Sequence, residues 1–213
     1  MQKYTCLQLT TRCIRVVTLQ FHQGNWVTSL SGEKPLPETL EGEDVFHHPA
    51  LARTAQDVFT ELSSRSEKVL LSIPGDGTLL KRIQTPTWGE ASSEQRNAAI
   101  AADIGNHISV PLDQATYDWA AMSQTERTTS WLVAWMRKEP LESLLLRLKE
   151  IRLEPLYVMP SSLVLANQLL FNEDCSQRIC GIHIDTGHID LVVMEEGQVM
   201  GGRSFSTGYP SNP

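Results

Sequence analysis

The sequence predicts a mixed α/β protein built from two related halves. The first observation is that residues 3–30 and 179–208 share one pattern, three alternating strands joined by short polar turns. The second is that the long segment between them combines strand pairs with amphipathic helices, unlike the strict alternation of doubly wound folds. We therefore expect two lobes that face each other across a cleft, each beginning with a three-stranded meander.

The composition indicates a globular protein and argues against two classes of function. Of the 213 residues, 41% are hydrophobic, which is enough for a sizeable core. The net charge of −7 argues against nucleic-acid binding, which requires a dense basic surface. No apolar run approaches the roughly 20 residues of a transmembrane helix, and the N-terminus lacks the apolar core of a signal peptide. We expect a cytoplasmic protein that reaches membranes only through partners.

The first third of the chain contains one meander, one loop and one helix. The turn at Thr10-Thr11 and the turn at Gly24 separate the three strands of residues 3–30. Residues 31–49 hold three prolines, two glycines and five carboxylates, which predicts an exposed loop. A helix then follows Pro49, because apolar residues recur at helical spacing over the next fourteen or so positions.

The middle of the chain predicts five strands and three helices. Strands are expected at 68–73, 78–83, 115–122, 128–136 and 156–159. Helices are expected at 93–107, 139–151 and 161–171. Ser92, with Gln95 three residues later, predicts the cap of the first of these helices. The complete predicted order is βββ-α-ββ-α-ββ-α-β-α-βββ.

Neither a metal site nor a catalytic triad is predicted. The four cysteines form no CxxC pair and have no histidine at metal-binding spacing, so we expect reduced thiols. His47-His48 lies in the acidic loop and is interpreted as a solvated pair. A nucleophilic triad would need residues from the set Ser161, Ser162, His183, His188, Asp185 and Asp190. No GxSxG motif supports it, and helix capping is the better interpretation of the two serines.

Three tryptophans form a candidate binding surface. Trp119, Trp131 and Trp135 lie on two neighbouring predicted strands, where an aromatic cluster would line a groove for a partner peptide. Core packing is the alternative, because Trp131 and Trp135 share one face of their strand.

The chain resembles the actin-like cytoplasmic proteins of pilus assembly, typified by PilM, with their MSHA-pilus and type II secretion (GspL-type) relatives. The resemblance covers nearly all 213 residues. It is carried by VLLSIPGDGTLLKRIQTPTW (69–88), HISVPLDQATYDWA (107–120), WLVAWMRKEPLESLLLRLKEIRLEPLYVMPSSLVLANQLL (131–170) and the meander from Cys180. Each motif is moderately specific, and their shared order is the stronger signal.

The resemblance implies an actin-like (ribonuclease H-like) α/β fold with mixed sheets. Residues 1–178 would form the first lobe, including an inserted small subdomain at about 75–130. Residues 179–213 would form the first meander of a second, truncated lobe. In the family the small subdomain sits beside the first lobe, and the cytoplasmic tail of a PilN-like inner-membrane partner binds between them.

The resemblance also implies two turns that would hold the phosphates of ATP. In such turns backbone N–H groups cradle phosphate, and an aspartate positions Mg²⁺. The corresponding residues are Thr10, Thr11, Asp185, Thr186 and Gly187. The family's Asp-x-Gly corresponds to Gln8-Leu9-Thr10, which lacks both the carboxylate and the glycine. The loop after Asp185 is also short, and an aspartate there is a common turn former. We therefore expect neither ATP nor Mg²⁺, and no catalytic residue.

The leading hypothesis is a cytoplasmic scaffold of a type IV pilus or related secretion apparatus, at the inner face of the bacterial inner membrane. It would bind the tail of a PilN-like partner. The alternative is a nucleotide-dependent actin-like ATPase of the same machinery, with part of the chain missing. If the second sheet stops after three strands, its unpaired edge favours a homodimer.

Overall fold

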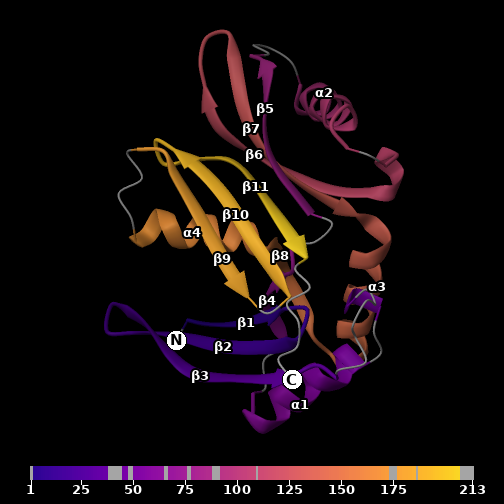
Figure 1. Ribbon diagram of the computed structural model, residues 1–213, viewed down its shortest axis with the longest axis vertical. Coiled ribbons are helices and arrows are strands. Elements are labelled where there is room, and N and C mark those ends of the chain that lie inside the picture. Colours follow the sequence, from indigo (N-terminus) through magenta and orange to yellow (C-terminus); the bar gives the residue numbers. More distant parts are fainter. Residues whose placement is uncertain are drawn as a thin grey trace.

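The computed structural model (Figure 1) describes residues 2–37, 45–47, 50–64, 67–75, 78–87, 92–108, 110–172, 177–185 and 187–206, and confirms the predicted order of elements. The strands are β1 (Lys3–Leu9), β2 (Cys13–His22), β3 (Asn25–Pro35), β4 (Lys68–Ile73), β5 (Thr78–Pro86), β6 (Ala115–Gln124), β7 (Thr128–Arg137), β8 (Glu154–Pro160), β9 (Ile179–Asp185), β10 (His188–Glu195) and β11 (Gln198–Ser206). The helices are α1 (Ala50–Glu61), α2 (Ser93–Gly105), α3 (Lys138–Glu150) and α4 (Ser161–Asn172), with 3₁₀ turns at Val45–His47 and Leu112–Gln114.

The first lobe is a mixed sheet in the order β3-β2-β1-β4-β8. β4 runs parallel to both β1 and β8, whereas the meander strands are antiparallel. Alternate residues of β1 are buried on the face that α1 and α3 cover, and the leucines of α3 complete this core. The other face of the sheet is therefore free to meet the rest of the chain.

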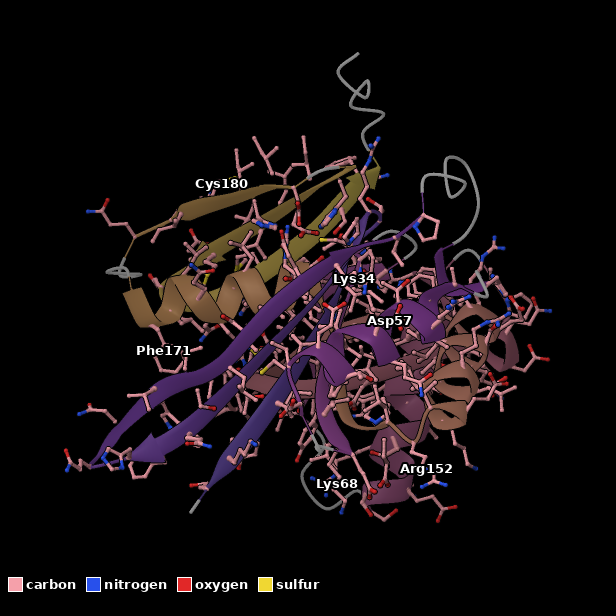
Figure 2. All side chains as sticks on the ribbon, turned by 90° about the horizontal axis from the view of Figure 1, so that it is seen from below. Lys34, Asp57, Lys68, Arg152, Phe171 and Cys180 are labelled. Carbon is pink, nitrogen blue, oxygen red and sulfur yellow. The ribbon has the colours of Figure 1, made fainter. Side chains whose placement is uncertain are left out.

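The third strand is longer than predicted. The proline-rich segment expected as a loop contributes its first residues to β3, which continues to Pro35. β3 is an edge strand, so the missing N–H of Pro35 does not interrupt an interior ladder. Lys34 near its end forms ion pairs with Asp57 and Glu61 of α1. Figure 2 shows Lys34 and Asp57 close together on this side of the molecule.

The second sheet has the order β6-β7-β5-β11-β10-β9 and is antiparallel throughout. The expectation that it stops after three strands is wrong, because β11 pairs with β5. The inserted segment thus shares a sheet with the final meander instead of only sitting beside the first lobe. Gly201 and Gly202 lie opposite Lys81 and Leu80 at this junction, and a Cβ on either glycine would press against Leu80.

Two helices cover opposite faces of the second sheet. Ile100 and Ile104 of α2 pack against Ile83 and Val133 on one face. Ala166 of α4 packs against a second cluster on the other face, which includes Leu80, Leu132, Val192, Met194 and Val199. Figure 2 shows α4 lying along β9, β10 and β11, with Phe171 near its outer end.

α4 connects the two lobes. It contacts β9, β10 and β11 of the second sheet and also β4 and β8 of the first. Gly181 of β9 allows this close packing, because a Cβ there would collide with the Leu169 side chain. Within the described ranges, no helix is both long and apolar enough to cross a membrane.

Candidate functional site

The two turns expected to hold phosphate lie against each other, in a contact that we call the interlobe seam and define as Thr10, Thr11, Arg15, Asp185 and Gly187. Arg15 of β2 donates from Nη1 to Asp185 Oδ2 at 2.7 Å and from Nη2 to Oδ1 at 3.4 Å. The Asp185 side chain is 8% exposed. The hydrogen bond to Asp185 is the main cause of the raised pKa of Arg15. The carboxylate at the second turn is thus paired with a cation of β2, which also forms an ion pair with the exposed Glu33 at 3.0 Å.

Arg15 is the cross-strand neighbour of Gln8 in the first sheet. It lies directly opposite Gln8 in the β1–β2 ladder, and Gln8 lies opposite Ser72 of β4. Gln8 is the residue that the resemblance matches to a metal-side carboxylate. The structure therefore places an arginine opposite the position where the resemblance would require a negative charge.

Backbone N–H groups of the first turn form hydrogen bonds within the turn itself. Thr10 is buried, and its Oγ1 accepts hydrogen bonds from the backbone N–H groups of Arg12 (3.2 Å) and Cys13 (2.8 Å). The same hydroxyl donates to the carbonyl of Cys13 at 3.0 Å. This is the side-chain-to-backbone pattern that serine and threonine form in tight turns. Two N–H groups of the turn are therefore already hydrogen-bonded within it.

Thr11 and Gly187 bring the turns into contact. Gly187 has a φ of +91°, and a Cβ at this position would collide with Thr11 Oγ1. Glycine is thus required both for the backbone conformation and for the close approach of the lobes. Of the five predicted nucleotide residues, Thr11 and Gly187 touch across the seam, and Asp185 pairs with Arg15. Thr10 forms hydrogen bonds within its own turn, and Thr186 lies outside the described residues.

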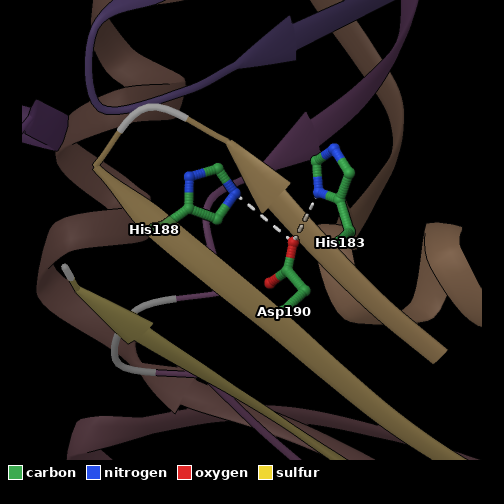
Figure 3. A group of neighbouring side chains, drawn as sticks. All are labelled: His183, His188 and Asp190. Carbon is green, nitrogen blue, oxygen red and sulfur yellow. Dashed lines mark hydrogen bonds and ion pairs between the residues drawn. The ribbon is translucent and has the colours of Figure 1, made fainter. Parts of the chain in front are cut away.

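A second polar group lies deeper in the same lobe interface, the Asp190 cluster, made of Ser161, His183, His188, Asp190 and Ser204 (Figure 3). Asp190 is fully buried, and its Oδ1 accepts hydrogen bonds from Ser204 Oγ and, at 2.8 Å, from Ser161 Oγ. Its Oδ2 lies 3.4 Å from His183 Nδ1 and 3.3 Å from His188 Nε2. Among the described residues, the two histidines and Asp190 are the group whose donor atoms could surround a metal ion.

Strand register explains how this cluster forms. Asp190 of β10 lies directly opposite His183 of β9 and Ser204 of β11, so the three side chains share one face of the sheet. His188, two residues before Asp190, points to the same face, and Ser161 arrives as the first residue of α4. A Cβ on Gly75 would collide with Ser204, so Gly75, which follows β4, also packs directly against the cluster.

Hydrogen bonds keep Asp190 ionised although it is buried. Burial alone would raise the pKa of this carboxyl group, but the adjacent His188 imidazole and the hydrogen bonds from Ser204 and Ser161 outweigh that effect. The resulting pKa is about 2. Asp190 is therefore a carboxylate at neutral pH.

The cluster is not arranged as a nucleophilic triad. In a triad the histidine lies between the serine and the carboxylate, so that it takes the proton of the hydroxyl. Here Ser161 donates directly to Asp190, and the histidines approach the other carboxylate oxygen. Part of this cluster could have been predicted from the sequence, because a hairpin with its predicted turn at residues 186 and 187 places His183 opposite Asp190.

The three candidate tryptophans share one face of the second sheet and are half-buried. Trp119 and Trp131 pack at the edge of the hydrophobic cluster between α2 and the second sheet. Trp131 Nε1 donates to Thr85 Oγ1 at 2.9 Å. Trp119 also stacks on Tyr117, with 5.9 Å between ring centroids. Core packing therefore accounts for part of their surface, and the remainder stays exposed.

The other candidates from the sequence lie elsewhere. His47, predicted to be solvated, pairs with the exposed Glu139 at 2.6 Å between Nε2 and Oε1, whereas His48 lies outside the described residues. Cys6, Cys13 and Cys180 are free thiols, and burial raises the pKa of Cys6. None of these residues belongs to the seam or to the Asp190 cluster as defined above.

The structure contains two sheets, each with a three-stranded β-meander, whose turns face each other and which α4 contacts on both sides. This is the arrangement expected of the actin-like fold. Comparison with solved structures confirms this fold class. The structure is similar to the PilM-PilN type IV pilus biogenesis complex, with a TM-score of 0.79 and 17% identity over 95% of this chain. The present chain spans 61% of that chain.

Two further solved structures share the fold. The cytoplasmic domain of EpsL, an inner-membrane component of the type II secretion system of Vibrio cholerae, matches with a TM-score of 0.62 and 12% identity over 96% of this chain and 71% of that one. A protein from Bacteroides thetaiotaomicron with an actin-like ATPase fold matches with a TM-score of 0.57 and 16% identity, over 97% and 70% of the two chains. Comparisons with protein-family models and with curated proteins find no match.

Proposed function

We propose that this chain is a non-catalytic, cytoplasmic scaffold of a type IV pilus or related secretion apparatus. It would be held at the inner face of the bacterial inner membrane by the cytoplasmic tail of a PilN-like protein. The observation that supports the assembly role is the structural likeness to a chain of the PilM-PilN type IV pilus biogenesis complex. The observation that carries the non-catalytic role is the Arg15–Asp185 ion pair of the interlobe seam.

Three contacts of the seam support a role without nucleotide. Phosphate binding in such turns uses backbone N–H groups, close approach at glycine and a carboxylate that faces Mg²⁺. In this chain the Thr10 hydroxyl accepts from two of the N–H groups, and Thr11 packs onto Gly187. Asp185 faces a guanidinium, which neutralises it without a metal ion. Binding MgATP would require all three contacts to separate.

The alternative is a nucleotide-dependent actin-like ATPase of the same machinery, with further chain that supplies the rest of the site. The retention of Asp185 and Gly187 at the second turn favours it. The two candidates differ in Mg²⁺-dependent ATP binding, which isothermal titration calorimetry measures directly. Binding that requires Mg²⁺ would support the ATPase and contradict the scaffold without nucleotide.

We expect the exposed parts of Trp119, Trp131 and Trp135 to contact the partner tail. Buried aromatic contacts contribute strongly at interfaces, so Trp135→Ala should weaken peptide binding about tenfold. The measurement is fluorescence anisotropy with labelled N-terminal tails of inner-membrane pilus proteins. Because the chain carries a net charge of −7, a tail rich in Lys and Arg should bind more weakly as salt rises.

Trp26 offers a matched control for the tail experiment. It lies in β3 of the first lobe, where it contacts Tyr4 and Phe21 with ring centroids 5.4 Å and 5.2 Å apart. Trp26→Ala should leave the affinity for the tail unchanged. A loss of affinity with Trp26→Ala alone would move the binding surface to the first lobe, and failure of every pilus tail to bind would contradict the proposed partner.

The outer face of the final meander supports self-association as a homodimer. Ile182 and Ile184 of the edge strand β9 are 59% and 66% exposed, and Val193 and Phe205 continue the same apolar face. No strand pairs with the outer edge of β9 among the described residues. An apolar face beside an open edge is a common route to pairing between two copies of a chain.

Charge on this face should prevent the association. Light scattering of the wild-type chain should show a dimer whose population rises with concentration. Ile184→Lys should weaken the dimerisation affinity about tenfold or more, because dimerisation would then bury the charged lysine at the interface. Leu146→Lys is the matched control, since Leu146 is 61% exposed on α3. A wild-type chain that stays monomeric at all concentrations would contradict the homodimer.

A further inference from the structure

We propose that His183, His188 and Asp190 form a binding site for one divalent transition-metal ion, with Zn²⁺ as the best match. This inference does not depend on the pilus assignment. It arises from the Asp190 cluster, which the scaffold role leaves unexplained. Figure 3 shows the two imidazole rings pointing toward one oxygen of the Asp190 carboxylate.

The spacing of the donor atoms suits a tetrahedral ion. Zn²⁺ binds nitrogen and oxygen ligands at about 2.0–2.2 Å, which separates tetrahedral neighbours by roughly 3.3–3.5 Å. Asp190 Oδ2 lies 3.4 Å from His183 Nδ1 and 3.3 Å from His188 Nε2. The three donor atoms lie within 4.8 Å of one another.

The same distances fit a hydrogen-bonded pair less well. Hydrogen bonds between a charged nitrogen donor and a carboxylate are usually about 2.7–2.9 Å long. Both histidine contacts with Asp190 are longer than this. The carboxylate is nevertheless held firmly, because Ser161 and Ser204 donate to its other oxygen.

These serine contacts resemble the outer shell of a metal site. Outer hydrogen-bond partners fix the orientation of a metal ligand and strengthen binding. Ser161 and Ser204 occupy Asp190 Oδ1 and so direct Oδ2 toward the histidines. The ligands themselves stand on the paired strands β9 and β10, which limits their movement.

The donor set selects the class of metal. Two imidazoles and one carboxylate suit Zn²⁺ and its neighbours in the transition series, whereas Mg²⁺ and Ca²⁺ prefer oxygen donors alone. Three protein ligands leave a fourth position for water. The His183 side chain is 39% exposed, so the ion can enter from that side.

The direct test is titration of the chain with ZnCl₂ after removal of metal with EDTA. Isothermal titration calorimetry should show one equivalent bound, and thermal unfolding should shift upward with Zn²⁺ because binding favours the folded state. Even the loss of an outer-shell partner typically lowers metal affinity about 10–100-fold. His183 is a proposed direct ligand, so His183→Gln should lower the affinity by about 100-fold or more. His183 is the preferred variant because it is partly exposed, whereas substitution of buried Asp190 also affects folding.

His107→Gln serves as the matched control. His107 follows α2 and lies 3.7 Å from Asp103, far along the chain from the cluster. This variant should bind Zn²⁺ as the wild type does. Titration with Co²⁺ adds a second readout, because a tetrahedral site with nitrogen and oxygen ligands gives visible absorption bands that His183→Gln should abolish. The proposal is overturned if no equivalent of Zn²⁺ binds, or if His183→Gln binds it as tightly as the wild type.

Discussion

Replacing Asp190 by alanine is expected to lower the free energy of unfolding by about 3–5 kcal/mol. Removal of one partner from a buried charged network leaves the others without compensation, which typically has an effect of this size. The buried Ser161 and the half-buried Ser204 would lose their acceptor, and the buried His188 would lose its ion-pair contact. Urea denaturation measured in EDTA gives the change in the absence of any bound metal.

Two further variants separate the network from a general effect of charge. Asp113 is exposed, so Asp113→Ala should change the free energy of unfolding by less than about 0.5 kcal/mol. Asp190→Asn keeps one oxygen that can accept from the serines and should destabilise less than Asp190→Ala. A loss below about 1 kcal/mol in Asp190→Ala would show that the cluster contributes little to stability.

Replacing Arg15 by alanine is expected to lower the free energy of unfolding by about 2 kcal/mol, because it removes a hydrogen-bonded charge from the nearly buried Asp185. A double-mutant cycle with Asp185→Ala should give a coupling energy of about 1–2 kcal/mol. Arg178→Ala is the matched control. Its ion pair with Glu195 is largely exposed, so its loss should have an effect below about 1 kcal/mol.

The Arg15 variant also tests the non-catalytic role. Neither the wild type nor Arg15→Ala should bind MgATP, because the Thr10 hydroxyl still accepts from the N–H groups of the first turn and Gln8 provides no carboxylate. If Arg15→Ala binds MgATP while the wild type does not, Arg15 would be a residue that closes a competent nucleotide site. That outcome would favour the ATPase alternative.

The order of strands and helices could be predicted from the sequence because it depends on local periodicity. Alternation with period two marks β1 and β10, and helical spacing marks α3. The end of β3 was predicted too early, because prolines and acidic residues indicate a loop wherever an edge strand can also hold them.

The Arg15–Asp185 contact of the seam could not be predicted from local sequence patterns. Thr10, Thr11 and Gly187 were recognisable as turn residues, but Arg15 had no special signal within its own strand. Its role follows from the register that places it opposite Gln8 and from the approach of the two lobes, which brings it to Asp185. Contacts between residues 170 positions apart along the chain depend on how the lobes pack.

The sequence by itself determined the fold class, the order of elements and the family resemblance, because hydrophobic periodicity, turn residues and motif order are properties of consecutive residues. Only the tertiary structure decided that β5 joins β11 in one sheet, that Arg15 closes the seam, and that Ser161 at the start of α4 reaches Asp190. These outcomes depend on strand pairing and on the packing of α4 between the lobes, which bring distant residues within hydrogen-bonding distance.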